Sequence, residues 1–126
     1  MSNIKKVEEF HQKFGQKVSS SQEWDEKTAK RRYDLIREEL DELQEGLLNK
    51  DPVEVFDALL DLEYVVLGSV LELGFYDKYQ EGFDEVHNSN MSKLGEDGNP
   101  IYREDGKVLK GPNYFEPNLE KILGRG

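Results

Sequence analysis

The sequence predicts an all-α fold, a four- to five-helix bundle with a small C-terminal β-hairpin and a dimeric core. Three observations support this prediction. Apolar residues recur at helical spacing in several segments before residue 93. One of these segments, residues 52–73, is apolar on nearly every side, which is typical of a helix in the middle of an assembly. After residue 96, turn residues replace the helical pattern and separate two short apolar stretches.

The first two helices are predicted from apolar periodicity. The first is expected over about residues 3–18, and the three serines that follow it break the pattern and form a short loop. The apolar face of this helix is formed by Ile4, Val7, Phe10 and Phe14. The second helix is expected from about Asp25 to Leu48, where an Asn-Lys-Asp-Pro sequence stops the pattern and restarts it.

The third helix is expected from about Pro52 to Leu73. Asp51 suits the N-cap position, and proline suits the first helical position because no N–H donor is needed there. Gly74 supplies the C-terminal stop. Because the chain is too small to cover every side of so apolar a helix, we expect a second subunit to complete the bundle.

The last part of the chain changes character. A fourth helix is expected over about residues 76–91. Residues 101–103 and 107–109 flank a Glu-Asp-Gly turn and predict the hairpin. Glycine and proline punctuate the chain beyond it, and a short final helix is expected at residues 119–123.

Composition limits the classes of function. A chain of 126 residues fits one domain, with a helical core at about residues 3–93 and a hairpin and tail at about 97–126. The net charge of −10 argues against nucleic acid and anionic membranes as partners. The absence of cysteine excludes disulfides and Cys-ligated zinc. Charges interrupt the first 17 residues and no apolar run could span a bilayer, so we expect a cytoplasmic protein.

Carboxylates lie where two of the predicted helices should carry apolar side chains. On the second helix, Glu39 falls inside the apolar arc and Glu42 lies at its edge. The third helix carries one narrow acidic stripe that consists of Glu54, Asp57, Asp61 and Glu72. Two neighbouring antiparallel helices would bring Glu39 and Glu42 opposite Asp57 and Asp61. Solvation does not explain acids that share a face with leucines.

Four such acids cannot all stay ionised in a dry interior unless cations compensate their charge. Mg²⁺ or Mn²⁺ prefers this all-oxygen set of ligands. The alternative for any single acid is ordinary surface charge, as for Glu38, which has Arg31 and Arg37 near it in the sequence. The pattern therefore predicts a divalent metal site that is carried by the group of acids.

Two polar residues near the end of the fourth helix form a second candidate site. Asn90 lies on an apolar stripe with Phe83 and Val86, so we expect its amide to face inward, and Lys93 follows one turn later. An amide followed by an ammonium group suits a sugar or base edge and a phosphate. Equally, the asparagine could cap the helix and the lysine could complement its dipole.

Two short motifs carry a family resemblance over about residues 10–93. Glu38-Glu39-Leu40-Asp41-Glu42 has the form E-E-x-x-E, and Asn90-Met91-Ser92-Lys93 has the form N-x-x-K. This combination resembles the all-α nucleoside triphosphate pyrophosphohydrolases, the superfamily of MazG, the phosphoribosyl-ATP pyrophosphohydrolases and the dimeric dUTPases and dCTPases. The combination of residues 87–93 with the tail at residues 110–114 resembles the MazG-like subgroup for which dUTP hydrolysis is described.

The chain departs from the family pattern in its E-x-x-D element. If Asp61 is the family aspartate, the glutamate position is occupied by Ala58, and Asp57 substitutes from one residue earlier. Alternatively, Glu54 and Asp57 form the element at an unusually short spacing. Both registers place Asp57 in the site.

The resemblance implies Mg²⁺-dependent hydrolysis of a (deoxy)nucleoside triphosphate, such as dUTP, to the monophosphate and pyrophosphate, a house-cleaning reaction of the nucleotide pool. It implies metal ligands among Glu39, Glu42, Asp57, Asp61 and Glu54. It further implies that Glu38 orients or deprotonates water and that Asn90 and Lys93 bind substrate. The expected assembly is a homodimer or a dimer of dimers. The alternative, which the Ala58 departure leaves open, is a non-catalytic dimeric helical module that binds a nucleotide or a protein, although the retained acids, Asn90 and Lys93 speak for catalysis.

Overall fold

The computed structural model describes residues 1–124 and contains five α-helices and one 3₁₀ turn in this range. The predicted all-α class is confirmed, because no β-strand is present in these residues. The chain forms two compact units, Met1–Asp77 and Lys78–Gly126. No helix within the described range is both long and apolar enough to cross a membrane.

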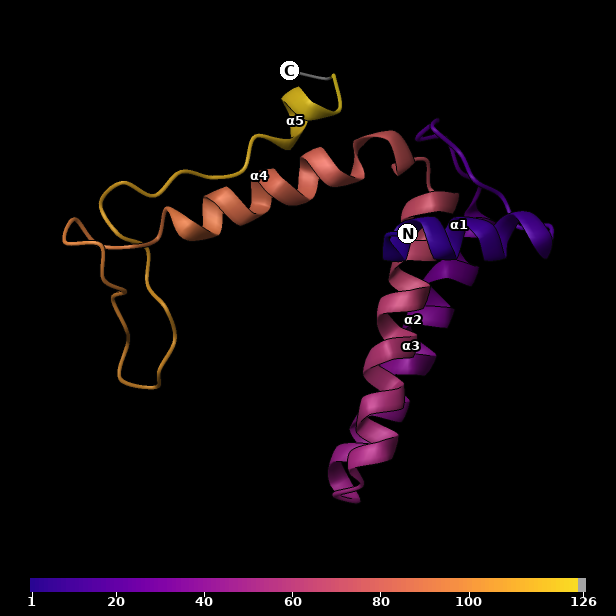
Figure 1. Cartoon of the computed structure of the whole chain (residues 1–126), viewed down its shortest axis with the longest axis horizontal. Coiled ribbons are helices and arrows are strands. Elements are labelled where there is room, and N and C mark those ends of the chain that lie inside the picture. Colours follow the sequence, from indigo (N-terminus) through magenta and orange to yellow (C-terminus); the bar gives the residue numbers. More distant parts are fainter. Residues whose placement is uncertain (125–126) are drawn as a thin grey trace. The chain divides into compact units, whose positions relative to one another are not determined.

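Three helices build the first unit. They are α1 (Asn3–Lys13), α2 (Glu26–Leu48) and α3 (Pro52–Glu72). Helices α2 and α3 lie side by side along their length, and α1 packs across α3 (Figure 1). The small apolar core of this unit consists of Val7, Ala58, Leu67 and Leu71.

Aspartate side chains cap the N-termini of α2 and α3, and the cap at Asp51 is the one that the sequence predicts. The Asp25 carboxylate accepts a hydrogen bond from the backbone N–H of Thr28 at 2.7 Å. The Asp51 carboxylate accepts from the first two free N–H groups of α3, those of Val53 and Glu54. These bonds satisfy donors that have no partner inside the helix, so each helix begins directly after its aspartate.

The first helix is shorter than predicted, because α1 ends at Lys13 and not near residue 18. Gly15 adopts a left-handed conformation with φ 73°, and the next N–H, that of Gln16, bonds back to the His11 carbonyl at 2.8 Å. This is a helix C-terminus in which glycine takes the left-handed position at little steric cost. Apolar periodicity alone does not detect such an end.

A close contact near their connection fixes how α2 and α3 approach each other. A Cβ atom on Gly46 would lie 3.1 Å from the backbone nitrogen of Val55, which is tighter than ordinary packing. The short connection between the helices includes Lys50 at φ 52°. Glycine at position 46 therefore lets the two backbones come together beside their turn.

A buried ion pair joins the other ends of the same two helices. Glu72 is 2% exposed, and its carboxylate accepts two hydrogen bonds from Arg31, at 2.9 and 2.8 Å. Arg32 is also buried, lies 3.6 Å from Glu72, and donates to the Ser69 hydroxyl and the Val65 carbonyl. Glu72, which the sequence pattern placed in the acidic stripe, therefore has arginine partners.

Much of the apolar surface of α3 is uncovered in the single chain. Val53, Phe56 and Leu60 are 79%, 64% and 50% exposed. On α2, Leu40 and Leu47 are 48% and 58% exposed. The helix that the sequence predicts to be central is thus covered on only some of its sides by this chain.

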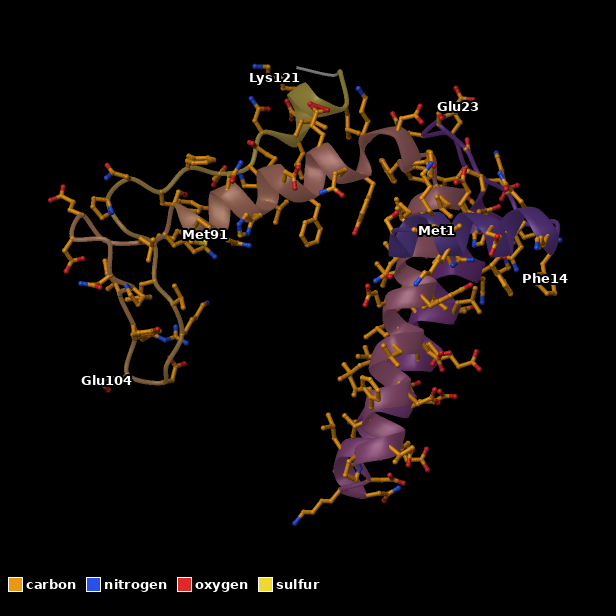
Figure 2. The ribbon with its side chains drawn as sticks, in the orientation of Figure 1. Met1, Phe14, Glu23, Met91, Glu104 and Lys121 are labelled. Atoms are coloured by element: carbon orange, nitrogen blue, oxygen red, sulfur yellow. The ribbon has the colours of Figure 1, made fainter. Side chains whose placement is uncertain are left out.

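The second unit is built on α4 (Tyr79–Met91), which follows the 3₁₀ turn Tyr76–Lys78. The predicted fourth helix therefore begins with a tighter turn. The tail returns along α4, with Met91 at the helix end and Lys121, in α5 (Leu119–Ile122), farther back along it (Figure 2). In place of the predicted β-hairpin, the tail shows one isolated antiparallel bridge, between Tyr102 and Val108.

Candidate metal centre

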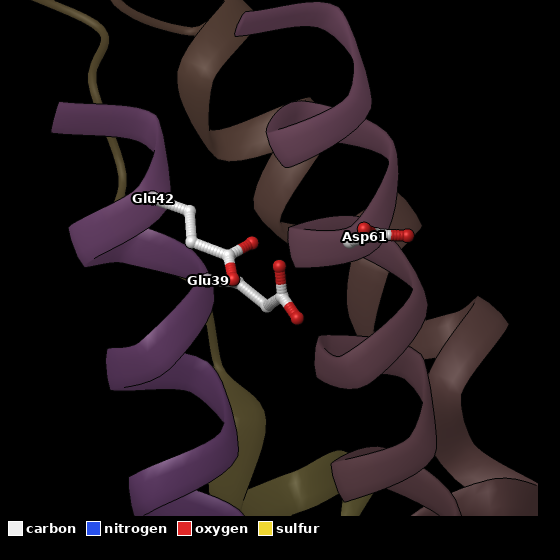
Figure 3. A group of neighbouring side chains, drawn as sticks. All are labelled: Glu39, Glu42 and Asp61. Atoms are coloured by element: carbon white, nitrogen blue, oxygen red, sulfur yellow. The ribbon is translucent and has the colours of Figure 1, made fainter. Parts of the chain in front are cut away.

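Three of the predicted carboxylates meet between α2 and α3. One oxygen each of Glu39, Glu42 and Asp61 lies within 4.8 Å of the other two. Glu39 and Glu42 are three residues apart on one face of α2 and extend toward α3, which carries Asp61 (Figure 3). The helix periodicity places the first two side chains together, and the packing of α2 on α3 adds the third.

Glu39 has the most unfavourable position in this group. Its Oε2 atom is buried and has no hydrogen-bond partner within residues 1–124. The pKa of Glu39 is raised to about 7, first by burial, then by the hydrogen bond and charge of Glu42, and last by the charges of Asp61 and Glu38. A buried acceptor without a donor, surrounded by further carboxylates, is the environment that a hard cation satisfies. The residues of the group therefore fit Mg²⁺ or Mn²⁺.

The remaining two predicted ligands flank this group. Burial raises the pKa of Asp61, and the charges of Asp57 and then Glu42 raise it further. The pKa of Glu54 is raised by burial first, followed by the charges of three acids, of which Glu42 is one. Asp57 and Glu54 thus lie close enough to act on the group electrostatically but do not join it. Of the five predicted ligands, the structure brings three together.

The departure at position 58 has a packing explanation. Ala58 is 2% exposed and belongs to the apolar core of the first unit. Asp61, one turn later on α3, is the residue that approaches the acids of α2. Asp61 is therefore the acid of α3 that joins the carboxylate group.

Glu38 lies outside the carboxylate group and is exposed. It lines a shallow groove on α2 with Lys27, Lys30, Arg31, Asp34 and Leu35.

Asn90 and Lys93 lie in the second unit. Asn90 is exposed, as are Phe83 (58%) and Val86 (38%), so the expectation that this stripe faces inward is wrong for the single chain. Lys93 lies beyond the last residue of α4 and is half-buried. The face of α4 that the tail covers is the neighbouring one, which carries Ser89.

Sequence reasoning missed the serines of this segment. The hydroxyls of Ser89 and Ser92 both bond to the backbone of Phe115 in the tail. Two small polar residues three positions apart on one helical face were the available signal. That spacing does not by itself identify what the hydroxyls contact.

The chain matches the family model described as phosphoribosyl-ATP pyrophosphohydrolase over residues 7–90. The matched span contains α2, α3 and all three members of the carboxylate group. The chain belongs to the phosphoribosyl-ATP pyrophosphohydrolase family. The prediction of a pyrophosphohydrolase, a hydrolase that acts on acid anhydrides, is thereby confirmed, and the match does not support the non-catalytic alternative.

One solved structure similar to this family member is that of a protein from Exiguobacterium sp. 255-15, provisionally described as an NTP pyrophosphohydrolase. The two sequences are 26% identical, the comparison covers 99% of this chain and 95% of the other, and the TM-score is 0.47. No curated protein matches the chain.

Proposed function

We propose that this pyrophosphohydrolase hydrolyses a deoxynucleoside triphosphate, with dUTP among its substrates, to the monophosphate and pyrophosphate, and that the reaction requires Mg²⁺ or Mn²⁺. The observation that carries the metal requirement is the unpartnered, buried oxygen of Glu39 within the carboxylate group. The resemblance of residues 87–93 and 110–114, taken together, to the MazG-like subgroup for which dUTP hydrolysis is described supports the choice of substrate. No strongly basic segment is available to hold a phosphoribosyl group, which argues against phosphoribosyl-ATP.

In this proposal, Glu39, Glu42 and Asp61 hold the metal, and Asp57 and Glu54 complete its surroundings. A bound divalent ion would supply positive charge for the triphosphate and lower the pKa of a coordinated water. Glu38 orients the attacking water and takes its proton, which an exposed carboxylate can pass on to solvent. The two substrate ligands of the second unit are Lys93, for a phosphate oxygen, and Asn90, for the sugar or base.

A nucleotide panel tests the reaction. Canonical and modified NTPs and dNTPs, together with phosphoribosyl-ATP, are incubated with the full chain and Mg²⁺ or Mn²⁺, and pyrophosphate is measured. We expect pyrophosphate and monophosphate from dUTP, and no release when EDTA removes the metal. Orthophosphate as the first product would contradict α-phosphorus attack. No product from any nucleotide would contradict the proposal as a whole.

We further propose that the chain assembles as a homodimer or a dimer of dimers through the uncovered faces of α2 and α3. Exposed leucine, valine and phenylalanine side chains on two adjacent helices favour burial against a second copy. Light scattering at micromolar concentration should give at least twice the chain mass of 14.6 kDa. Phe56→Asp should lower that mass, whereas Tyr102→Asp, a matched change on the tail bridge, should not. A monomeric wild-type chain would exclude the proposed dimer.

A further inference from the structure

The C-terminal tail is tied to the end of α4 by hydrogen bonds at one of its residues. The Ser89 hydroxyl, in a side chain that is 3% exposed, donates to the Phe115 carbonyl at 2.8 Å. The Phe115 N–H donates to the Ser92 hydroxyl at 3.1 Å, and that hydroxyl donates to the Ser89 carbonyl at 2.6 Å. Both backbone polar groups of Phe115 are therefore bound by serines of α4 and its cap.

A second contact between the tail and the end of α4 involves the backbone carbonyl of Lys93. The Gly111 N–H donates to the Lys93 carbonyl at 2.9 Å. A Cβ atom on Gly111 would overlap the Leu94 carbonyl oxygen and come within 2.7 Å of that of Lys93. Only glycine can bring the tail backbone this close, so the contact depends on the residue type at position 111.

These bonds act where a helix is least ordered. The last carbonyls of a helix have no partner within it, and helix ends fray unless outside groups bind them. Lys93 lies just past the helix, and its own N–H makes a single turn-like bond to the Asn90 carbonyl at 3.1 Å. The tail therefore supplies an outside partner for the Lys93 carbonyl and for the hydroxyls of Ser89 and Ser92, and so restrains the chain on both sides of the helix end.

We propose that the tail segment 111–118 positions Lys93 for its contact with substrate phosphate, with Gly111 and Ser92 as the positioning residues. This inference rests on the role given to Lys93 in the proposed function. A lysine side chain has many rotamers, so a fixed backbone reduces the conformational freedom that phosphate binding must remove. Loss of the tie should weaken nucleotide binding without altering the carboxylate group, which lies in Met1–Asp77.

The main test replaces Gly111 with alanine in the full chain. We expect KM for the nucleotide, and Kd for a non-hydrolysable α,β-imido analogue, to rise about tenfold, the scale of a weakened charge-assisted hydrogen bond. The value of kcat should change less than about threefold. The matched control is Gly82→Ala, a change within α4 whose Cβ would meet no neighbouring atom within 4 Å, and it should leave both constants unchanged.

A double-mutant cycle shows whether the tail acts through the lysine. Lys93→Ala alone should raise Kd, and Gly111→Ala should add no further increase in that background. Ser92→Ala should also raise Kd, and Ser92→Thr, which keeps the hydroxyl, should restore it. Hydrogen exchange of residues 92–95 should be faster in Gly111→Ala than in wild type.

The outcomes separate this inference from the proposed reaction. The positioning role would be overturned if the increases in Kd caused by Gly111→Ala and Lys93→Ala were additive. It would also be overturned if Gly111→Ala left Kd unchanged although hydrogen exchange of residues 92–95 became faster. An unchanged Kd in Lys93→Ala would overturn it as well, even with pyrophosphate release intact. If no nucleotide is hydrolysed but the analogue binds and shows the expected cycle, the proposed reaction fails and the positioning role stands.

Discussion

Replacing Glu39 with glutamine is expected to lower metal-dependent pyrophosphate release by roughly 10²–10³-fold, the scale seen when one group that stabilises transition-state charge is removed. Glutamine has nearly the same shape as glutamate, so the helices should remain intact. It removes the negative charge from the residue whose buried oxygen lacks a partner. Initial rates at saturating Mg²⁺, with circular dichroism to verify helix content, measure the effect.

The matched control for this variant is Asp41→Asn. Asp41 belongs to the same motif on α2, but it is exposed and paired with Arg37 at 3.4 Å, outside the carboxylate group. We expect its rate to stay within about twofold of wild type, because an exposed ion pair contributes little. Equal losses in both variants, or full activity in Glu39→Gln, would show that Glu39 is not a metal ligand.

The same variant should change how stability depends on pH. The pKa of Glu39 is raised from its ordinary value of 4.5 to about 7 in the folded chain. Below pH 4.5 the group is protonated in both folded and unfolded states, so it costs no stability there. Between about pH 4.5 and 7 the unfolded chain ionises first, and stability therefore falls as pH rises. The raised pKa of Asp61 acts in the same direction.

We therefore expect the melting temperature of the metal-free chain to decrease from pH 5 to pH 7.5. Saturating Mg²⁺ should reduce this decrease, because bound cation stabilises the ionised folded state. Glu39→Gln should flatten the pH dependence and lose most of the response to Mg²⁺. An identical pH slope in variant and wild type would contradict the assignment of the raised pKa to this residue.

The second large effect is expected for Glu72→Gln, which should destabilise the first unit by about 3 kcal/mol, because one partner of a buried ion pair is neutralised. Arg31 is half exposed and can turn to solvent, but the side chain of Arg32 is 5% exposed and would remain buried beside a neutral partner. Burial already lowers the pKa of Arg32, and the Glu72 charge opposes that shift. Urea denaturation followed by circular dichroism measures the loss.

Two further variants define this result. Asp34→Asn breaks an ion pair at the surface, in which the side chain of Asp34 is 55% exposed and that of Lys30 is 78% exposed. This change should alter the free energy of unfolding by no more than about 0.5 kcal/mol. Adding Arg32→Met to Glu72→Gln should recover stability, because no buried charge then remains. Ser69 would stay satisfied, since its hydroxyl also donates to the Val65 carbonyl. A loss below about 1 kcal/mol in Glu72→Gln would show that the pair is not critical.

Local signals in the sequence predicted the boundaries of a helix well where a capping side chain sets the first helical residue. Asp51 could be identified as a cap because it precedes a helical pattern and offers a carboxylate to the first N–H groups, whereas Asp25 was predicted only as the approximate start of α2. The end of α1 was missed, because Phe14 continues the apolar period into the C-cap, where the N–H of Phe14 still bonds to the Phe10 carbonyl. The tail was harder still, because its order depends on serine contacts with a residue more than twenty positions away.

The sequence by itself determined that Glu39 and Glu42 share one face of α2, because helical periodicity is a local property of the chain. It also identified the acidic face of α3, but Asp57 and Asp61 are one turn apart on that face, and periodicity cannot distinguish them. Only the axial offset between the helices does so. That offset is set by the close approach at Gly46 near the turn and by the contacts of Arg32 with Ser69 and Val65 at the other end. Tertiary structure therefore decided that Asp61 joins the group and that Glu72 pairs with arginine, because axial offset depends on contacts between residues far apart in the chain.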